Sequence, residues 1–554
     1  MSRRISLISV VILNVLWFAA SQGAAIPDRV QMAAQSGQRV WVFLHDKGPD
    51  ALRRISPMSA FVSARALARI QTRGQATDPL LDLPVSDPYR RALANAGLEI
   101  HLESRWFNAV SGTVNFRDLD SIAALPFVDS LRVVATSDMP LPDTTAPLVL
   151  LPRIERQAGD VYDYGPSRPQ LAAIQVNLLH TAGLSGRGVR IGFLDTGFSL
   201  GITIFAHTAI VGTRDFINGD ADVGDGQAGQ MHHGTQTLSL CAGLDEGHLV
   251  GVAPNGEYAV AKTEIVDQEI RVEEDNWVAG LEWLDSLGCD LASSSLGYVK
   301  WYHYQDLDGN TALCTIAADL AATRGLLVVN AAGNGGCSGD SLIAPADGDS
   351  VLTVGAADAD GNRASFSSCG PTFDGRIKPD VIAPGVGVIT AYPNDRVYQP
   401  GSGTSFATPL VSGVCALLLE KNPSLTPYQL IDLLHRTATN ARKPLSTFGW
   451  GMVQAEKAAG PVVASVDEII ARPNPANYTV NIVIPDSDAA DPWTFRVFTV
   501  AGQSVYSKTN NTGSNLGEWF GVTDSGEKVA PGVYLILVRT SLHSKLLKVA
   551  WVGH

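Results

Sequence analysis

The sequence has no excess of basic side chains. Lysine and arginine number 41 against 55 aspartates and glutamates, so the formal net charge of the 554 residues is −14. Proteins that bind nucleic acid or an anionic membrane surface carry a basic patch. This balance therefore argues against both kinds of partner, and the acidity itself is typical of a soluble protein.

Long apolar runs are absent after the first 25 residues. Arg3 and Arg4 precede an almost wholly apolar stretch from Ile5 to Ala20, and small residues follow over 21–25. This order predicts a cleavable signal peptide over residues 1–25. An uncleaved anchor helix is the alternative, but the run is short for a bilayer. We therefore expect a secreted protein with no transmembrane segment after removal of the signal.

The six cysteines have no spacing typical of a zinc site. Export would permit disulfides, but six cysteines can pair in many ways, so no pairing is assigned. Cys241 and Cys415 lie in apolar helical runs, where a free thiol can be buried as a small hydrophobic side chain.

The chain is too long for one hydrophobic core, and its pattern predicts three domains after the signal peptide. Residues 26–137 alternate short strands and helices, as in a small α+β domain. Residues 138–169 are rich in Pro, Asp and Gly and indicate a linker. Residues 170–460 alternate apolar strands with helices, which is typical of a parallel α/β sheet. Residues 466–554 contain only β-rich segments and predict a β-sandwich.

Five strands are expected in the α/β domain, because short apolar runs there are bounded by turn residues. They cover residues 189–194, 258–261, 291–294, 326–330 and 351–355.

Three motifs carry residues suited to nucleophilic catalysis. Asp195 ends a buried strand in GFLDTG (192–197), His233 opens an apolar helix in HHGT (232–235), and Ser405 starts a helix in GTSFATP (403–409). Functional sites in parallel α/β sheets lie beyond the carboxyl ends of the strands. These three side chains can therefore converge.

Their chemistry is complementary. A serine hydroxyl is a weak nucleophile at neutral pH and needs a base, for which histidine has a suitable pKa. A carboxylate holds the imidazole in the correct tautomer. Asn334, in the segment AAGNG (331–335), and the Ser405 backbone N–H could donate hydrogen bonds to the developing oxyanion.

The order Asp, His, Ser is that of subtilisins, and residues 170–460 resemble the subtilase family in DTG, HGT, SLG, AAGN and GTSxATP. The resemblance implies a serine endopeptidase that works through an acyl-enzyme, with Asp195, His233 and Ser405 as the catalytic triad and Asn334 in the oxyanion hole. It also implies that two segments line the cleft and pair with an extended peptide: Ser295, Leu296 and Gly297, and Ala331, Ala332 and Gly333.

Two residues close to His233 bear on the choice of the base. Gln236 stands where many subtilases have a second histidine, but that residue is not the base. His232 directly precedes His233, and we assign the base to His233 because it fills the motif position.

The flanking domains resemble parts of subtilases exported by the type IX route of Gram-negative bacteria. For residues 36–134 the likeness rests on VFLHDK (42–47), SARAL (63–67), DLPVS (82–86) and RWFNA (105–109). It implies a zymogen with an inhibitor-like propeptide that is cut in the linker. The alternative is a permanent structural domain.

The last domain shares RPNP (472–475), FTVAGQ (498–503) and APGVY (530–534) with type IX sorting domains. The likeness implies recognition by that secretion machinery and a location outside the cell or on its outer surface. A structural cap or a carbohydrate-binding module is the alternative.

The implied chemistry requires no cofactor. Structural calcium is possible at Asp306, Asp308 and Asn310, which offer oxygen ligands at close spacing. Such polar runs are usually turns. The acidic residues at 220, 222 and 225 are a weaker candidate.

Two other functions compete with hydrolysis by a serine nucleophile. An inactive scaffold or binding protein of subtilase fold is one, although all four catalytic positions are filled. An aspartic protease using Asp195 and Asp524, each followed by a Thr-Gly or Ser-Gly pair, is the other. That interpretation leaves HHGT and GTSFATP without a role.

Overall fold

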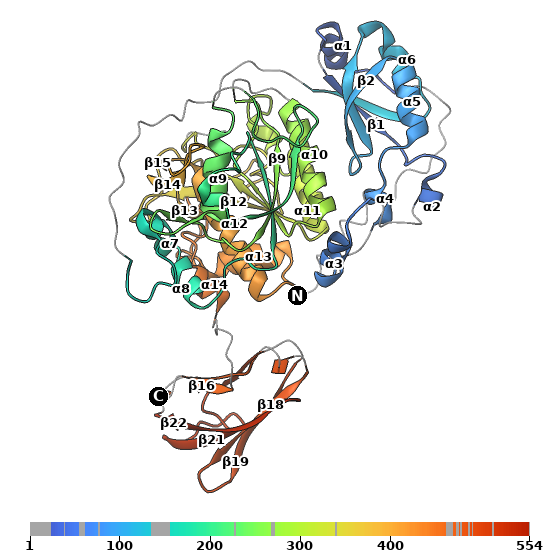
Figure 1. Ribbon diagram of the computed structural model, residues 1–554. Coiled ribbons are helices and arrows are strands. Elements are labelled where there is room, and N and C mark those ends of the chain that lie inside the picture. Colours follow the sequence, from blue (N-terminus) through green and yellow to red (C-terminus); the bar gives the residue numbers. More distant parts are fainter. Residues whose placement is uncertain are drawn as a thin grey trace. The chain divides into compact units, whose positions relative to one another are not determined.

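The computed structural model describes residues 24–37, 39–54, 61–75, 78–134, 156–226, 229–266, 272–337, 341–460 and most of 469–552. They form two compact units that divide near Gly460 (Figure 1). Nearly all of the predicted signal peptide, linker residues 138–155 and the prolines of the 472–475 motif lie outside the described residues. None of the described helices is long and apolar enough to cross a membrane.

The N-terminal domain is an antiparallel sheet covered by helices, which agrees with the predicted α+β class. Its strands lie in the order β2-β3-β1-β4. They are β1 (Arg39–Leu44), β2 (Leu98–Ser104), β3 (Ala109–Val114) and β4 (Val128–Val133). The helices of this layer are α1 (Asp28–Gln35), α5 (Asp87–Asn95) and α6 (Leu119–Ala123). Alternate residues of β1 and β3 bury apolar side chains against Leu93 and Leu119. Three short helices between β1 and α5 stand outside this layer: α2 (Ala51–Arg54), α3 (Ala64–Thr72) and α4 (Pro79–Asp82).

The central domain is built on a seven-stranded parallel sheet with the order β13-β12-β11-β10-β5-β9-β6. The strands are β5 (Arg190–Asp195), β6 (Ala209–Asp215), β9 (Glu257–Lys262), β10 (Leu291–Ser294), β11 (Leu327–Ala331), β12 (Val351–Ala357) and β13 (Val381–Pro384). All five predicted strands are present. The prediction missed β6 because this edge strand is largely exposed, and β13 because this short edge strand ends in a proline, Pro384, which is unusual within a strand.

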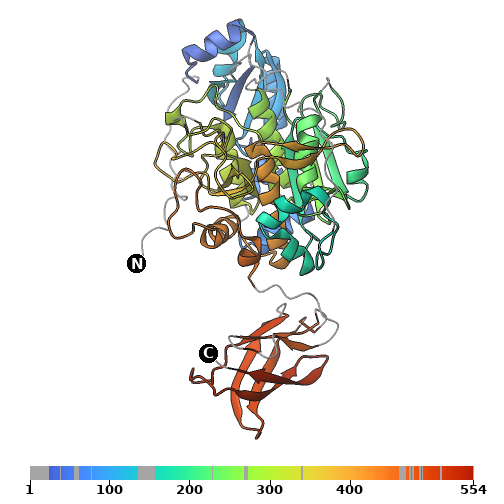
Figure 2. The ribbon, with the colours of Figure 1, turned by 90° about the vertical axis from the view of Figure 1, so that its left-hand side faces the viewer.

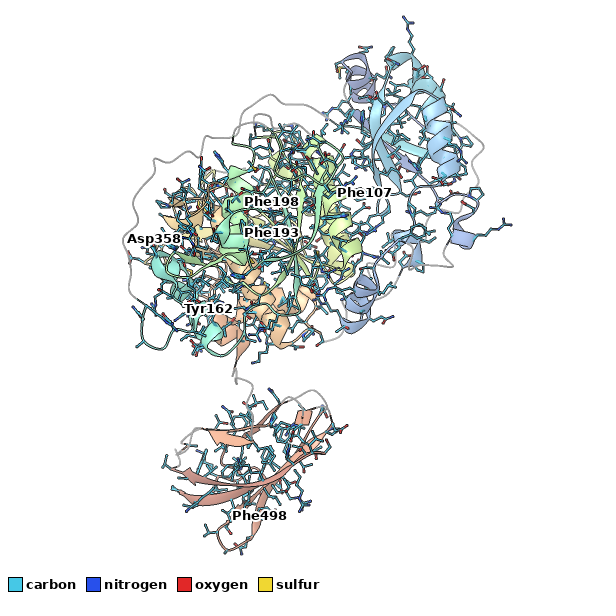
Figure 3. The ribbon with its side chains drawn as sticks, in the orientation of Figure 1. Phe107, Tyr162, Phe193, Phe198, Asp358 and Phe498 are labelled. Carbon is cyan, nitrogen blue, oxygen red and sulfur yellow. A yellow bond between two sulfur atoms is a disulfide. The ribbon has the colours of Figure 1, made fainter. Side chains whose placement is uncertain are left out.

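Helices cover both faces of this sheet. α10 (Val272–Leu287) packs beside α11 (Leu313–Thr323), and α9 (His232–Ala242) packs beside α12 (Thr404–Lys421) (Figure 1). Because both faces are covered, the strands inside the sheet are almost wholly buried. Phe193 of β5 and the nearby Phe198 are both buried in this core (Figure 3).

Smaller elements surround the sheet. They are α7 (Arg168–Ala173), α8 (Val176–Thr181), α13 (Pro427–Thr437) and α14 (Ala455–Ala459), the hairpin β14 (Val388–Ala391) and β15 (Tyr398–Gly401), and the pair β7 (Leu244–Asp245) and β8 (Leu249–Val250). Cys337 and Cys369 form a disulfide, whereas the other four cysteines are free and buried.

The predicted linker is too long at its C-terminal end. Residues 156–169 are packed on the central domain, where Asp160 pairs with Arg168 at 2.6 Å and the Tyr164 hydroxyl lies 2.9 Å from His180 Nδ1. These contacts give partners to polar side chains of a segment that its composition alone had assigned to a linker. Residues 156–169 therefore belong to the central domain.

The C-terminal unit consists of two antiparallel sheets and confirms the predicted β-sandwich (Figure 2). One sheet has the order β16-β17-β20 and the other β19-β18-β21-β22. The strands are β16 (Ile470–Arg472), β17 (Val480–Val483), β18 (Trp493–Thr499), β19 (Ser504–Asn510), β20 (Leu516–Trp519), β21 (Gly532–Arg539) and β22 (Ser544–Trp551). Their inner faces bury Trp493, Trp519 and Trp551.

Candidate active site

Asp195 is the last residue of β5, at the carboxyl edge of the sheet, and its side chain is only 1% exposed. Its carboxylate accepts hydrogen bonds from the Thr196 backbone N–H (2.7 Å) and the Thr237 hydroxyl (2.9 Å). His233 Nδ1 lies 2.7 Å from Oδ1. These donors allow the carboxylate to remain buried, because a buried charge without partners is very costly. No motif pointed to Thr237, which lies one turn after His233 on α9.

His233 occupies the first turn of α9 and binds Asp195 through Nδ1, which leaves Nε2 free of that contact. Burial lowers the pKa of His233, but the charge of Asp195 and its hydrogen bond outweigh burial and raise the pKa above the ordinary value of 6.5. The site therefore stabilises the protonated imidazole. The ring lies 6.1 Å from the ring of Phe406, the residue after Ser405.

Ser405 lies in the first turn of α12. Its Oγ is 3.4 Å from the Ser295 carbonyl oxygen, and Ser295 Oγ donates to the Ser405 carbonyl at 2.8 Å. No hydrogen bond joins Ser405 to His233 among the described contacts. Such catalytic hydrogen bonds are often long in the absence of substrate. The fold thus joins Asp195 to His233 directly, and it places the ring of Phe406, the residue after Ser405, near the ring of His233.

The side chain of Asn334 is oriented by Thr404. Asn334 Oδ1 accepts hydrogen bonds from the Thr404 backbone N–H (2.9 Å) and hydroxyl (3.1 Å). A backbone N–H can only donate, so the amide oxygen must face Thr404 and the amide nitrogen Nδ2 points away. Thr404 precedes Ser405, so this contact holds the donor of Asn334 close to the nucleophile position.

The two predicted substrate segments are neighbours, because β10 and β11 pair in parallel. Ser295, Leu296 and Gly297 follow β10, and Ala331 to Gly333 lie at the end of β11. Ile343, which the sequence analysis missed, fills the space between them. A Cβ on Gly297 would lie 2.5 Å from Ile343, and one on Gly333 would lie 3.1 Å from it. Ile343 belongs to no motif, so only the fold reveals it.

The residues considered as alternatives to the base make other contacts. His232 Nδ1 lies 2.9 Å from the Tyr392 hydroxyl, and Gln236 Nε2 donates to Thr390 at 3.0 Å. Neither contact involves Asp195. The geometry therefore favours His233 over His232 as the partner of the carboxylate.

The calcium candidates make turn contacts. Asp306 accepts the His303 N–H (2.8 Å), and Asp308 accepts the Asn310 N–H (2.8 Å). In the other candidate, Asp225 pairs with the Lys262 ammonium at 2.5 Å. No group of three or more His, Cys, Asp or Glu residues suited to a metal occurs in the part of the chain that the structure describes. Calcium at these positions stays a prediction.

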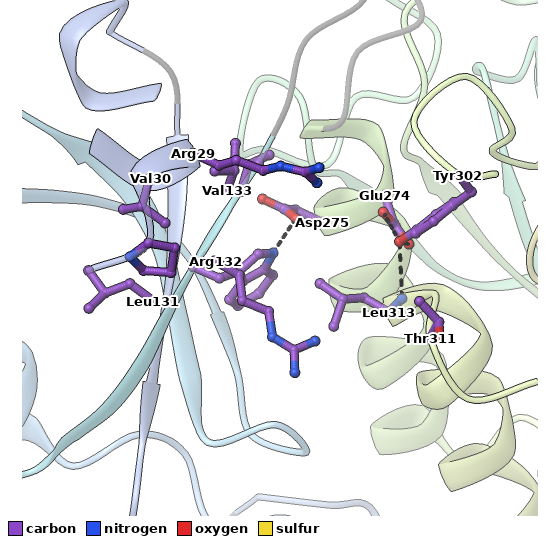
Figure 4. Close-up of a pocket in the computed structure, with 13 residues that line it drawn as sticks. Arg29, Val30, Leu131, Arg132, Val133, Glu274, Asp275, Tyr302, Thr311 and Leu313 are labelled. Carbon is purple, nitrogen blue, oxygen red and sulfur yellow. Dashed lines mark hydrogen bonds between the residues drawn. The ribbon is translucent and has the colours of Figure 1, made fainter. Parts of the chain in front are cut away.

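A separate cavity of about 250 Å³ lies between the N-terminal domain and the first turn of α10 (Figure 4). Arg132 and Trp41 line it from the N-terminal domain, and Glu274 and Asp275 line it from α10. Trp41 Nε1 donates to Asp275 at 2.5 Å. Burial is the main reason that the pKa of Asp275 rises to about 7. None of the predicted catalytic residues lines this cavity, so it belongs to the contact between the two domains.

Comparison with known proteins gives matches for the central and the N-terminal domain. Residues 186–451 match the model of the subtilase family, Peptidase S8, and residues 39–146 match the Peptidase S8 propeptide domain of Bacteroidota. Subtilisin DY of Bacillus licheniformis is 36% identical over 291 residues, which are 52% of this chain and 96% of the relative. Subtilisin BL of Lederbergia lenta is 35% identical over 289 residues, 52% and 97% of the two chains.

The chain belongs to the subtilase family. It is a serine endopeptidase with an N-terminal propeptide domain. The solved structure of the protease domain of PatA aligns with this subtilase at 26% identity and a TM-score of 0.42, over 50% of this chain and 95% of that one.

Proposed function

We propose that this subtilase hydrolyses peptide bonds in proteins by means of Asp195, His233 and Ser405. The observation that carries the proposal is the 2.7 Å contact between Asp195 Oδ1 and His233 Nδ1. It fixes the tautomer in which Nε2 is unprotonated and can accept the Ser405 proton. Ser405 Oγ then attacks the carbonyl carbon, and the protonated His233 gives the proton to the leaving amine. Water releases the acyl group by the same steps.

Asn334 serves the oxyanion hole in this scheme. Its oxygen is held by Thr404, so Nδ2 and the Ser405 backbone N–H are the donors for the negative charge that develops on the carbonyl oxygen. Donors that are already oriented cost no reorganisation during the reaction. We further propose that residues 295–297 and 331–333 bind the substrate as an added strand.

A nucleophile replacement tests the proposal. Ser405→Ala should lower kcat on casein by roughly 10⁶-fold, the size of the effect known for a subtilisin nucleophile. Covalent labelling by a fluorophosphonate should disappear in the same variant. The exposed Ser424→Ala is the matched control and should keep full activity. All variants are assayed after the propeptide has been removed. Equal casein hydrolysis by Ser405→Ala would then rule out the mechanism, and an inactive parent would favour the scaffold alternative.

The propeptide is proposed to inhibit the enzyme until the chain is cut within residues 135–155. The propeptide match and the extensive contacts of this domain with α10 support this role. N-terminal sequencing of the secreted enzyme should find a start after residue 134. A start before residue 60 would instead indicate a permanent structural domain.

Secretion and sorting are proposals that rest on the sequence patterns of the two ends. The signal peptide would direct export, and the β-sandwich over residues 466–554 would act as a type IX sorting domain that delivers the enzyme to the cell surface or medium. A periplasmic reporter fused to these residues should then leave the cell, whereas a reporter retained in the periplasm contradicts sorting.

A further inference from the structure

One segment of the propeptide stands apart from the hydrophobic core of its own domain. That core is formed by side chains from residues 24–44 and 85–133, and none comes from the part of residues 45–84 that the structure describes. Instead Leu81 packs against the core of the catalytic domain, and Ala66 and Ile70 of α3 are buried. We call residues 61–75, which include α3, the arginine arm. The catalytic domain holds this arm in place.

Three arginines follow one another along the arm at a spacing of four residues and therefore share one face of α3. Arg65 and Arg73 each bind a different oxygen of Asp290 at 2.8 Å. Arg69 binds Asp285, and both of these side chains are at most 2% exposed. A guanidinium is suited to such contacts because its planar fork donates several hydrogen bonds at once.

The arm also binds the carbonyl groups at the ends of α10 and α11. The last carbonyls of a helix lack partners within the helix, and they carry the negative end of its dipole. The arm supplies donors to five carbonyls there: Ser63 N to Ser286 O (2.9 Å), Arg65 Nε to Gly288 O (3.2 Å), Arg69 Nε to Arg324 O (3.2 Å), Arg69 Nη1 to Cys289 O, and Arg73 Nη1 to Gly325 O.

Both helices are followed by a glycine with a positive φ, and the arm packs closely against both glycines. α10 is followed by Gly288 with φ +79° and α11 by Gly325 with φ +81°. A Cβ on Gly288 would lie 2.7 Å from the Ala66 nitrogen, and one on Gly325 would lie 3.0 Å from Arg73 Cδ. Glycine is therefore needed at both positions for the turn, and at Gly288 also for the approach of the arm backbone.

The propeptide sheet makes contacts of its own with α10. The sheet reaches Asp275 in the first turn of α10 through Trp41, whereas the arm reaches Asp285 in the last turns. Asp275 and Asp285 lie ten residues apart on α10, which is about 15 Å along the helix axis. The end of β2 also reaches this part of α10, where Ser104 donates to Glu282 and Arg105 pairs with Asp285. Among the described contacts, none links the arm to Asp195, His233 or Ser405.

We propose that the ends of α10 and α11, together with Asp285 and Asp290, form a docking surface for a helix with arginines at four-residue spacing. In the unprocessed chain the arginine arm occupies it. This surface holds the propeptide on the catalytic domain after the linker has been cut, and it does so independently of the substrate cleft. The inference rests on the proposed function only in assuming that the linker is cut.

The test measures how long the cut propeptide stays bound. The full chain carries Ser405→Ala, so that it cannot process itself, and a recognition sequence for a site-specific protease within residues 138–150. After cutting, gel filtration over time gives the rate at which the propeptide separates. Arg69→Gln combined with Arg73→Gln should speed separation by about 100-fold or more, because it leaves buried charges unpaired.

Two further variants keep the test decisive. Arg91→Gln combined with Arg117→Gln changes two exposed arginines of the same domain and should stay within about twofold of the parent. Arg69→Lys keeps the charge but loses the fork, so about tenfold faster separation is expected even if the double variant fails to fold. A rate equal to that of the parent in either arm variant overturns the proposal, as does a parent whose propeptide leaves within minutes. Neither outcome depends on whether Ser405 is the nucleophile.

Discussion

Asp195 and Asp285 are both buried aspartates of the catalytic domain, but their surroundings differ. Asp195 accepts hydrogen bonds from a backbone N–H and a hydroxyl, and its one titratable partner is His233. Asp285 faces three guanidinium groups: Arg324 of the same domain, and Arg69 and Arg105 of the propeptide. Burial alone would raise the pKa of Asp285, yet these charges hold it below its ordinary value.

The two aspartates therefore have different roles. Around Asp195, neutral donors leave one histidine whose protonation can change during a reaction. Around Asp285, charges that never titrate near neutral pH fix two domains together. Substitutions in the first region should change the rate of hydrolysis, and substitutions in the second should change stability and propeptide binding.

Asp195→Asn should lower kcat by about 10⁴-fold or more. The asparagine amide can turn an N–H toward Nδ1, which favours the tautomer that cannot accept the serine proton. The measurement is kcat on a peptide substrate after an added protease has digested the propeptide away. The exposed Asp432→Asn is the control and should retain the parent rate. A loss of less than tenfold would show that the carboxylate does not orient His233.

The contrast between the two regions also explains what the sequence could predict. Asp195, His233, Ser405 and Asn334 lie in short motifs, where the chemistry demands fixed residue types beside a strand end or helix start. Arg69 and Asp285 are 216 residues apart, and ion pairing across domains leaves no local pattern. The buried strands were predictable from apolar runs, whereas the exposed edge strand β6 and the packed segment 156–169 depend on tertiary contacts.

Asp285→Ala should destabilise the unprocessed chain by about 3–5 kcal/mol, because Arg69, Arg105 and Arg324 would be left buried without this counter-charge. The measurement is the urea midpoint of the full chain carrying Ser405→Ala. Asp432→Ala removes an ion pair to Arg436 in which both side chains are more than half exposed, and it should cost less than about 1 kcal/mol. Equal midpoints for the two variants would mean that the guanidinium cluster adds nothing to stability.

Asp275 lies on the same helix as Asp285 and also contacts the propeptide, but its partners there are neutral donors. The Trp41 and Ser111 side chains donate to it, and its pKa of about 7 lies above the ordinary 3.8. Burial is the main cause, and the charge of Glu274 adds to it. When the propeptide leaves, the carboxyl should become exposed and its pKa should fall.

The bound state thus holds the Asp275 proton more tightly than the free state does. This contribution to propeptide binding should be complete below about pH 4 and lost as the pH rises to about 7, by at most about tenfold per pH unit. Asp275→Asn imitates the protonated acid, so its propeptide should separate at pH 8 about as slowly as that of the parent at pH 4. The gel-filtration assay on the cut chain measures these rates. A parent whose propeptide separates equally fast at pH 5 and pH 8 would mean that Asp275 keeps its charge beneath the propeptide, as Asp285 does.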